Sequence, residues 1–266
     1  MKYYDYHLHS EHSFDGCLSV SEIASLALAK GLEGIMLTDH VEFVGLRPVE
    51  LIPDLKAYQK DIELARKKYP QLSIGMGMEL GLMPGFQERY QEISEAALWD
   101  FVIGSAHYMN NCNLHTDEFM LGKTKDEIWI EYLKNLEQLV KEIPHFDVLG
   151  HLDLLRRNAR MRHLSFSWQE YQKEIDDLLM ALISRGKGLE VNTGSLRHQL
   201  KEPHPVSSIL ARYRQLGGEI VTCGSDAHLA DSVGKDIKIT YDYIKAAGFK
   251  HISLFEKRKV RQLPLR

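Results

Sequence analysis

Residues 209–228 read ILARYRQLGGEIVTCGSDAH, in which an amphipathic helix stops at a glycine and leads into a short apolar run. Gly217 fits the left-handed position just past the C-terminus of a helix. The apolar run has the length and composition of a strand that is buried on both faces. The segment therefore predicts one helix-to-strand unit whose strand breaks into the polar residues GSDAH.

The same arrangement occurs at three other places in the chain. Helical patterns at residues 23–30, 175–185 and 241–247 are followed by Gly31, Gly186 and Gly248, and then by the runs GIMLTDH, GLEVNTG and HISLF. Helices and strands that alternate at this spacing predict right-handed parallel β/α units. Further strands are expected at residues 3–8, 73–79, 101–105 and 146–150, and further helices at residues 55–68 and 125–141.

The expected strands number seven or eight, which favours a closed or distorted barrel. An open doubly wound sheet more often carries a glycine-rich phosphate loop, GxGxxG or GxxxxGKS/T, and the sequence contains neither. We find no linker or low-complexity run, so residues 1–266 are predicted to form a single α/β domain, a distorted TIM-like barrel. The connections at residues 41–54, 108–123 and 154–168 are longer than usual, which is typical of loops that carry function.

The composition predicts a globular protein of the cytoplasm. A chain of 266 residues with 44% hydrophobic residues can bury one large core. No segment approaches the ~18 consecutive apolar residues that span a membrane, and the start, MKYYDYHLHSEHS, lacks the apolar stretch of a signal peptide. Cys17, Cys112 and Cys223 form no CxxC pair, so we expect reduced cysteines and no thiolate zinc site.

The charge balance favours a small substrate. The formal net charge is −4, which argues against a general basic surface that grips long nucleic acid. We therefore expect a small-molecule phosphate ester as partner, with nucleic acid disfavoured and no membrane contact. The oligomeric state stays open.

Metal-binding side chains follow the predicted strands. These strands end in, or directly precede, the residues His7, His9, His40, Glu79, His107, His151, Asp226 and His228. The carboxyl ends of the strands of a β/α barrel meet at one face, where active sites are built. A single histidine in a strand is usually structural, but chance would rarely place ligands at so many strand ends. The sequence therefore predicts a metal centre at this face.

For several of these residues the sequence also predicts how they bind metal. Side chains two residues apart in a strand point to the same side, so His7 and His9 can reach one ion. Glu79 follows the apolar run SIGMGM, and a carboxylate aimed into the barrel mouth is best satisfied between two cations. Asp226 and His228 repeat the spacing of His7 and His9 among small residues. We expect Glu79, Asp226 and His228 to serve catalysis as well as metal binding.

The number and type of ligands indicate the cofactor. About six imidazoles and two or three carboxylates exceed what one tetrahedral ion uses, so two or three divalent ions are expected. Nitrogen and oxygen ligands without thiolate suit zinc, manganese or iron, and the sequence does not choose among them.

At this point the sequence resembles the PHP family, the polymerase and histidinol phosphatase domains. The matching motifs run in family order: YHLHSEHSFDG at residues 6–16, LTDH at 37–40, GMELG at 77–81, SAHY at 105–108, GHLD at 150–153 and GSDAH at 224–228. The resemblance implies a distorted (β/α)7 barrel with a trinuclear metal centre. It also implies three ligand sets: His7, His9, Glu79 and Asp226 on one ion, Glu79, His107 and His151 on a second, and Asp15, His40 and His228 on a third.

The third ion leaves one choice open. His12 lies close to Asp15 in the same loop and is a rival ligand, because some family members have a histidine at the position of Asp15. We prefer Asp15 because the residues SFDG match the commoner family pattern.

The stand-alone length, the loop after GHLD and the tail HISLFEKRKVRQLP resemble the histidinol-phosphatase branch. The resemblance implies hydrolysis of L-histidinol phosphate to L-histidinol and phosphate, in histidine biosynthesis. Two ions roughly 3.5 to 4 Å apart can activate a water and bind phosphate oxygens. Arg160, in the loop LLRRNAR, and Arg197, after EVNTGS, are expected to hold the substrate phosphate, with Arg156, Arg157 and Arg162 as rivals.

Three alternatives to this function are considered. An exonuclease or nucleotide phosphoesterase of the same family is disfavoured by the acidic balance and the lack of a basic, aromatic-rich stripe. A protein-tyrosine phosphatase is the second alternative. A barrel that binds metal for regulation without catalysis is the third, and the complete ligand set argues against it.

Overall fold

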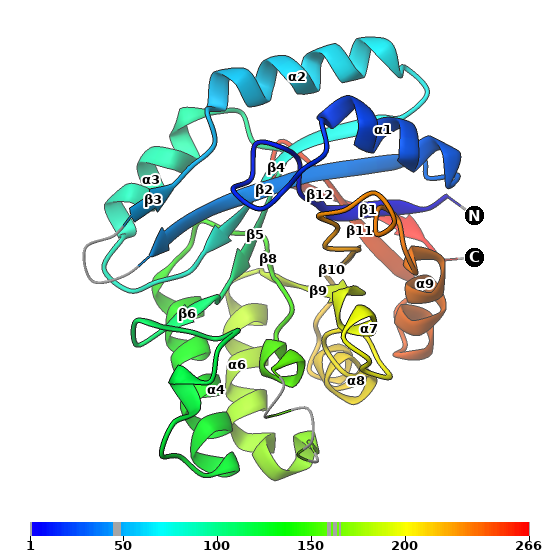
Figure 1. Cartoon of the computed structure of the whole chain (residues 1–266). Coiled ribbons are helices and arrows are strands. Elements are labelled where there is room, and N and C mark those ends of the chain that lie inside the picture. The colour runs from blue at the N-terminus through cyan, green and yellow to red at the C-terminus, as the bar shows by residue number, and fades with distance from the viewer. Residues whose placement is uncertain (1, 45–48, 159–160, 162–163, 165, 266) are drawn as a thin grey trace.

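Seven parallel strands form a nearly closed barrel within residues 2–44, 49–158, 161, 164 and 166–265, the part of the chain that this computed structural model describes (Figure 1). The strands, in their order around the barrel, are β1 Tyr4–Leu8, β2 Gly34–Val44, β4 Ser73–Gly81, β5 Phe101–Ser105, β8 Val148–Leu149, β9 Gly188–Asn192 and β10 Val221–Gly224. A parallel bridge between Leu8 and Ala227 connects β1 to the segment after β10. The distorted (β/α)7 barrel that we expected is confirmed.

Helices follow the strands along the chain, and most of them cover the outside of the barrel (Figure 1). They are α1 Val20–Ala29, α2 Leu55–Lys68, α3 Gln87–Ala96, α4 Lys125–Glu142, α6 Gln172–Ser184, α7 Gly194–Arg197, α8 Ser207–Gln215 and α9 Ile237–Ala246, with 3-10 turns η1 Glu118–Met120, η2 Leu154–Arg157 and η3 Trp168–Tyr171. Every helix expected from the sequence is present. Helix α3 was not predicted, because Tyr90 and Ile93 are its buried residues and so short an apolar stripe gives a weak periodic signal.

The ends of the helices are set by local hydrogen bonds that the sequence encodes. Ser19 caps α1 and Thr124 caps α4, and in both helices a glutamate three residues later completes a capping box. The glycines expected at the left-handed position after a helix do adopt positive φ angles of 65 to 99°: Gly31, Gly186, Gly217 and Gly248. Because glycine has no Cβ, the chain reverses there without a clash and enters the next strand.

A register shift in β1 turns two of the predicted ligands into the barrel. Asp5 pairs with Ile35 of β2, but Leu8 pairs with Leu37, so β1 holds one extra residue over this interval. Leu8 packs in the apolar layer shared with the helices. His7 and His9, which flank Leu8 in the sequence, therefore point to the opposite side, the barrel interior.

The fourth predicted unit, the run HISLF, does not join the barrel. It forms β11 His251–Glu256, which pairs antiparallel with β12 Lys259–Pro264 in a separate hairpin. Leu254 and Phe255 of this hairpin pack against residues inside the barrel: Tyr4, Tyr6, Met36, Phe101, Ile103 and Val148. The prediction of a parallel strand was wrong, because the described strands already close the sheet. The last apolar run is instead buried by covering the amino-terminal end of the barrel.

Two of the long connections contain short antiparallel strands. Strand β2 continues past His40 and pairs with β3 Val49–Leu51, and β6 Tyr108–Met109 pairs with β7 Cys112–Asn113. The connections at residues 41–54 and 108–123 are thus partly hairpins at the carboxyl end of the barrel. The connection at residues 154–168 lies partly outside the described residues.

Two further expectations concern the environment of the chain. Within the described ranges, no helix combines the length and the apolar character that crossing a bilayer requires. Cys17, Cys112 and Cys223 form no disulfide in the structure; Cys223 is buried in the core, whereas Cys17 is exposed.

Candidate metal centre

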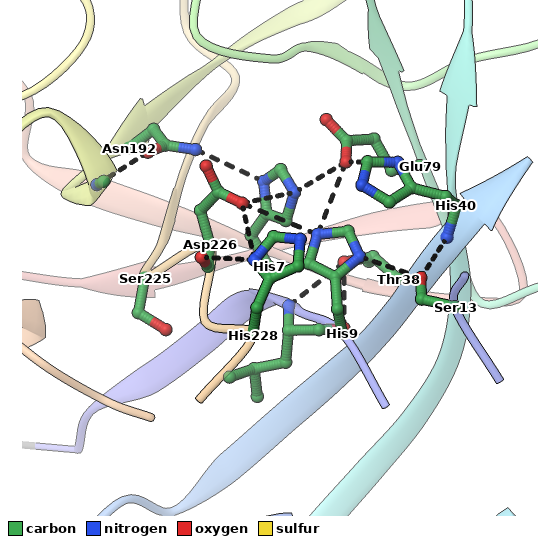
Figure 2. A network of polar contacts seen from close by, with 12 residues as sticks. His7, His9, Ser13, Thr38, His40, Glu79, Asn192, Ser225, Asp226 and His228 are labelled. Carbon is green, nitrogen blue, oxygen red and sulfur yellow. Dashed lines mark hydrogen bonds and ion pairs between the residues drawn. The ribbon is translucent and has the colours of Figure 1, made fainter. Parts of the chain in front are cut away.

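The ligands predicted from the sequence converge at the carboxyl end of the barrel, beside a cavity of about 490 Å³. Figure 2 shows His7, His9, His40, Glu79, Asp226 and His228 of this group. The side chains that gather there are His7, His9, Asp15, His40, Glu79, His107, His151, Asp226 and His228. A larger cavity, of about 590 Å³, lies at the opposite end between the strand starts and the β11–β12 hairpin, and none of these side chains lines it. The chemistry therefore belongs to the smaller cavity.

Glu79 lies at the centre of the cluster, with its side chain only 1% exposed. Its Oε2 atom is 3.1 Å from His7 Nε2 and 3.4 Å from His9 Nε2. Its Oε1 atom is 3.0 Å from His151 Nε2 and 3.3 Å from His107 Nε2. Oε2 is also 3.2 Å from His40 Nδ1. The two carboxylate oxygens thus face different sets of imidazoles, which is the arrangement of a carboxylate that bridges two cations.

Asp226 completes the group around His7 and His9, but from a turn and not from a strand. Its Oδ1 atom lies 3.7 Å from His7 Nε2 and 3.6 Å from His9 Nε2. We expected Asp226 and His228 to repeat the strand spacing of His7 and His9, and this was wrong. Strand β10 ends at Gly224, and Asp226 has a φ angle of 55°, a left-handed conformation that non-glycine residues rarely adopt outside functional or strained positions.

A third group forms around Asp15. Its Oδ2 atom lies 3.2 Å from His228 Nε2 and 3.5 Å from His40 Nε2. The ring of His9 stacks between the same two imidazoles, with centroid distances of 4.3 Å to His40 and 4.1 Å to His228 (Figure 2). His12, the rival of Asp15, points away from the group.

The ring of His12 is held by helix α2. Its Nε2 atom pairs with Asp61 at 3.1 Å, and the ring contacts Tyr58. The side chain that the structure brings to His40 and His228 is therefore that of Asp15.

The electrostatics of the cluster fit bound cations. Among the described residues, His7 Nε2 and His9 Nε2 are buried without a hydrogen-bond partner. Burial and the neighbouring charges of His40 and His228 hold the pKa of His9 well below its usual value, so its ring stays neutral and keeps a lone pair. Burial opposes ionisation of Glu79, but the charges of His7, His107 and His40 outweigh it and hold its pKa well below the usual value. An ionised Glu79 beside a neutral His9, whose Nε2 atom has no hydrogen-bond partner, suits a divalent metal.

Three residues at the site were missed by the sequence reasoning. Glu190 contacts His7, Glu42 contacts His107, and Ser13 lies 3.2 Å from His9 Nδ1 while accepting a hydrogen bond from the His40 amide. A detectable signal existed for the glutamates. Both lie in buried strands, where a charged residue requires a partner, but the sequence does not say which partner.

The predicted phosphate-binding arginines lie in different situations. Arg160 and its rival Arg162 lie outside the described residues. Arg197 donates from its two terminal nitrogens to the backbone carbonyls of Ser225 at 2.7 Å and Asp226 at 2.6 Å. It therefore lies beside the centre with part of its donor capacity in use.

Two rivals in the η2 turn point in different directions. Arg157 lines the cavity itself and donates to Asp226 Oδ2 at 3.2 Å. Arg156 instead pairs with Asp153 at 2.9 Å and with the carbonyl of Pro203 at 3.3 Å. Of these two arginines, Arg157 is the one that faces the cavity.

The order of the ligand-bearing strands matches a known family. A family model described as the PHP domain matches residues 5–194. The chain belongs to the PHP domain family. The resemblance drawn from the motifs is thus confirmed, and the matched PHP segment contains every predicted ligand except Asp226 and His228, which follow it.

This PHP domain protein has relatives of the same length that are histidinol-phosphatases. The histidinol-phosphatase of Lactococcus lactis is 30% identical over 262 residues, which cover 98% of this chain and 97% of the relative. A crystal structure of histidinol phosphate phosphatase from that organism, in complex with zinc, L-histidinol and phosphate, matches with a TM-score of 0.86 at 29% identity and covers 98% of this chain and 99% of that chain. The expected kinship with the histidinol-phosphatase branch is confirmed.

A second solved structure, from Listeria monocytogenes, supports the fold alone. It matches with a TM-score of 0.77 at 18% identity and covers 89% of this chain and 99% of that chain. This chain therefore shares its barrel with both solved structures, and with the Lactococcus protein it also shares clear sequence similarity.

Proposed function

We propose that this PHP protein is a metal-dependent phosphatase that hydrolyses L-histidinol phosphate to L-histidinol and inorganic phosphate. The observation that carries the proposal is the convergence of Glu79 and Asp226 with the surrounding imidazoles at the barrel mouth. The chain is similar over its full length to the histidinol-phosphatase of Lactococcus lactis, and the solved structure from that organism holds zinc, L-histidinol and phosphate. Both similarities support L-histidinol phosphate as the substrate. The reaction would serve histidine biosynthesis.

We assign the ligands to three divalent ions. One set comprises His7, His9, Glu79 and Asp226, the second comprises Glu79, His107 and His151, and the third comprises Asp15, His40 and His228. Zinc is favoured because the Lactococcus structure contains it and because the donors are nitrogen and oxygen atoms, which also suit manganese and iron.

We expect about three divalent ions per chain after gentle purification, because the ligands exceed what one or two tetrahedral sites use. Elemental analysis against protein concentration measures the ratio. Separate reconstitution with zinc, manganese and iron then identifies the ion that restores turnover. A ratio of one or less in a fully active protein contradicts the trinuclear assignment.

The residues of the chain have distinct tasks in the proposed reaction. When bound, the divalent ions supply positive charge that polarises phosphoryl oxygens and activates a water near neutral pH. Glu79 offers one oxygen to each of two ligand sets. Asp226 presents Oδ1 to His7 and Oδ2 to Arg157, so its carboxylate connects the metal centre with the cationic side of the cavity. His228 lines the same cavity with a partly exposed ring and can contact substrate.

We propose that arginines bind the substrate phosphate. A guanidinium can donate two parallel hydrogen bonds to phosphate oxygens, which a lysine cannot. Arg157 is supported by its position in the cavity wall, and its Nε atom has no hydrogen-bond partner among the described residues. Arg160 and Arg197 remain candidates from the sequence, and Arg197 lies next to Asp226.

A substrate panel tests the proposed function. We expect the highest kcat/KM for L-histidinol phosphate, compared with a simple aryl phosphate, a phosphodiester, a phosphotyrosine peptide and single-stranded DNA, each with zinc, manganese or iron. The physical reason is the small cavity and the net charge of −4, which disfavours a long polyanion. The Glu79→Gln protein, prepared in parallel, measures turnover by contaminating phosphatases.

The panel also separates the alternatives. A kcat/KM on the oligonucleotide comparable to that on L-histidinol phosphate would indicate a nuclease. Preference for the phosphotyrosine peptide would indicate a protein phosphatase. Metal binding without turnover of any substrate would indicate a regulatory barrel.

A further inference from the structure

Two buried carboxylates outside the predicted ligand sets contact metal-ligand histidines from behind. Glu190 Oε1 lies 2.5 Å from His7 Nδ1, and Glu42 Oε1 lies 2.5 Å from His107 Nδ1. The side chains of Glu190 and Glu42 are 1% and 3% exposed. A buried carboxylate is costly unless it is paired and hydrogen-bonded, so both positions call for a physical explanation.

Distances separate hydrogen bonding from shared metal binding. Two donors on one tetrahedral ion each lie about 2.0 to 2.2 Å from it, so they are more than about 3 Å from each other. The Nε2 atoms of His7 and His107 lie 3.1 and 3.3 Å from oxygens of Glu79, within that range. The 2.5 Å contacts at Nδ1 leave no space for an ion and instead fit a strong hydrogen bond to a charged acceptor.

We propose that Glu42 and Glu190 are positioning residues of the metal centre, which accept the Nδ1–H groups of His107 and His7 and aim the Nε2 lone pairs at the ions. A proton fixed on Nδ1 leaves the lone pair on Nε2, orients the ring and makes it a more basic ligand. The inference rests on the proposed metal centre and is independent of the substrate.

Charge gives a second reason for the two glutamates. The proposed ligand sets contain the carboxylates of Glu79, Asp226 and Asp15. Three divalent ions carry six positive charges, which neutral imidazoles do not offset. Glu42 and Glu190 add two negative charges directly behind the ligands, where the low dielectric of the interior strengthens their attraction to the ions.

The two glutamates differ in their other contacts. Glu190 Oε2 also accepts hydrogen bonds from the backbone amide of His151 at 3.0 Å and from Asn192 Nδ2 at 3.1 Å. It therefore joins β9 to the residue that follows β8, as well as to β1. Glu42 Oε2 has no hydrogen-bond partner in the described part of the chain. Glu42 Oε1 also lies 3.5 Å from His40 Nδ1, so a substitution at Glu42 affects the surroundings of two predicted ligands, His107 and His40.

Glycines provide the space that both carboxylates occupy. A Cβ atom at Gly81 would collide with the carboxylate of Glu42, and its three nearest atoms all belong to that carboxylate. A Cβ atom at Gly224 would collide with His7 and lie 2.8 Å from Glu190 Oε1. A Gly81→Ala substitution therefore displaces Glu42 without removing a charge or a ligand.

The test is zinc affinity, measured on the full-length protein by competition with a chelator and without substrate. We expect Glu42→Gln and Glu190→Gln each to weaken zinc binding by about 10- to 100-fold, the usual effect of losing a partner behind a metal ligand. Gly81→Ala should weaken it in the same direction. The number of ions bound at saturating zinc should equal that of the wild type, because no ligand has been removed.

A matched control is Asp147→Asn. Asp147 is a partly buried carboxylate with its side chain 10% exposed, paired with Arg258 Nε at 2.5 Å, but it belongs to the other end of the barrel. It should alter thermal stability and leave zinc affinity unchanged. If Glu190→Gln fails to fold, the zinc affinities of Glu42→Gln and Gly81→Ala still test the inference.

Two results would overturn the inference. Unchanged zinc affinity in Glu42→Gln and Gly81→Ala would show that the contact does not position His107. Fewer ions at saturating zinc in Glu42→Gln would show that Glu42 is itself a ligand. Because zinc binding is measured without substrate, failure of the proposed phosphatase function leads to neither result.

Discussion

Replacing Glu79 with glutamine is expected to abolish turnover of L-histidinol phosphate, with a loss in kcat on the order of 100-fold or more, while the protein stays folded. The two oxygens of Glu79 face separate sets of imidazoles. A neutral amide cannot balance two cations, and its nitrogen would present N–H groups to one of these sets. The fold should persist because glutamine has the same shape and a neutral group suits a buried position.

Steady-state kinetics, metal content and thermal unfolding together decide this prediction. The control is Asp100→Asn, a carboxylate at the other end of the barrel that pairs with Arg66 at 3.0 Å. This control should retain wild-type kcat. Near-normal turnover and full metal content in Glu79→Gln would show that Glu79 has a structural role.

Removal of the arginines proposed to bind phosphate is expected to lower kcat/KM by roughly 10- to 1000-fold, which corresponds to about 1.4 to 4 kcal/mol. The prediction covers Arg157→Ala, Arg160→Ala and Arg197→Ala. Arg→Lys variants should recover only part of the loss, because lysine supplies charge without the planar fork. Inorganic phosphate should inhibit the wild type competitively and the Ala variants less.

Metal affinity and phosphate inhibition separate two roles of Arg197. If it binds phosphate, phosphate inhibition weakens and metal content is unchanged. If it acts only through the carbonyls of Ser225 and Asp226, metal affinity falls and phosphate inhibition is unaltered. Arg212→Ala is the control, because Arg212 forms a two-contact ion pair with Asp176 on the protein surface.

Unaltered kinetics and phosphate inhibition in all three Ala variants would remove these arginines from the site. Attention would then move to Arg156 and Arg162, the remaining arginines of the same loop. Arg156 is the weaker candidate, since its guanidinium already pairs with Asp153.

The barrel could be predicted because its signals are local. A glycine such as Gly217 with a positive φ angle marks the end of a helix, and an apolar run such as that of β10 marks a strand buried on both faces. These features depend on residues within one helix-to-strand unit. Helix α3 was missed because its packing rests on Tyr90 and Ile93, too few apolar positions to stand out in the sequence.

The placement of the last apolar run could not be predicted from local signals. The residues HISLF resemble a barrel strand, but whether a strand enters the sheet depends on whether an edge is still free. In the described structure, the parallel bridge of Leu8 with Ala227 occupies that edge, so β11 pairs with β12 instead. Closure is a property of the whole sheet.

Part of the candidate site could likewise be predicted from the sequence, and part could not. Histidines and carboxylates at strand ends were predicted to converge because parallel strands bring their carboxyl ends together. Glu42 on β2 and Glu190 on β9 each contact a histidine from beyond one intervening strand, and their partners His107 and His7 are distant in the sequence. No local pattern announces such a contact.

The sequence by itself determined the order of the barrel strands and most of the ligands that gather at the barrel mouth, because both follow from periodicity and from spacing along the chain. Asp15 was expected from the resemblance to the PHP family. Only the tertiary structure decided which side chains meet. It brought Asp15 to His40 and His228 while Asp61 holds His12, and it turned Asp226 into the site through a left-handed residue. The physical reason is that side-chain partners depend on register, bulges and turn conformation, which arise when the sheet closes.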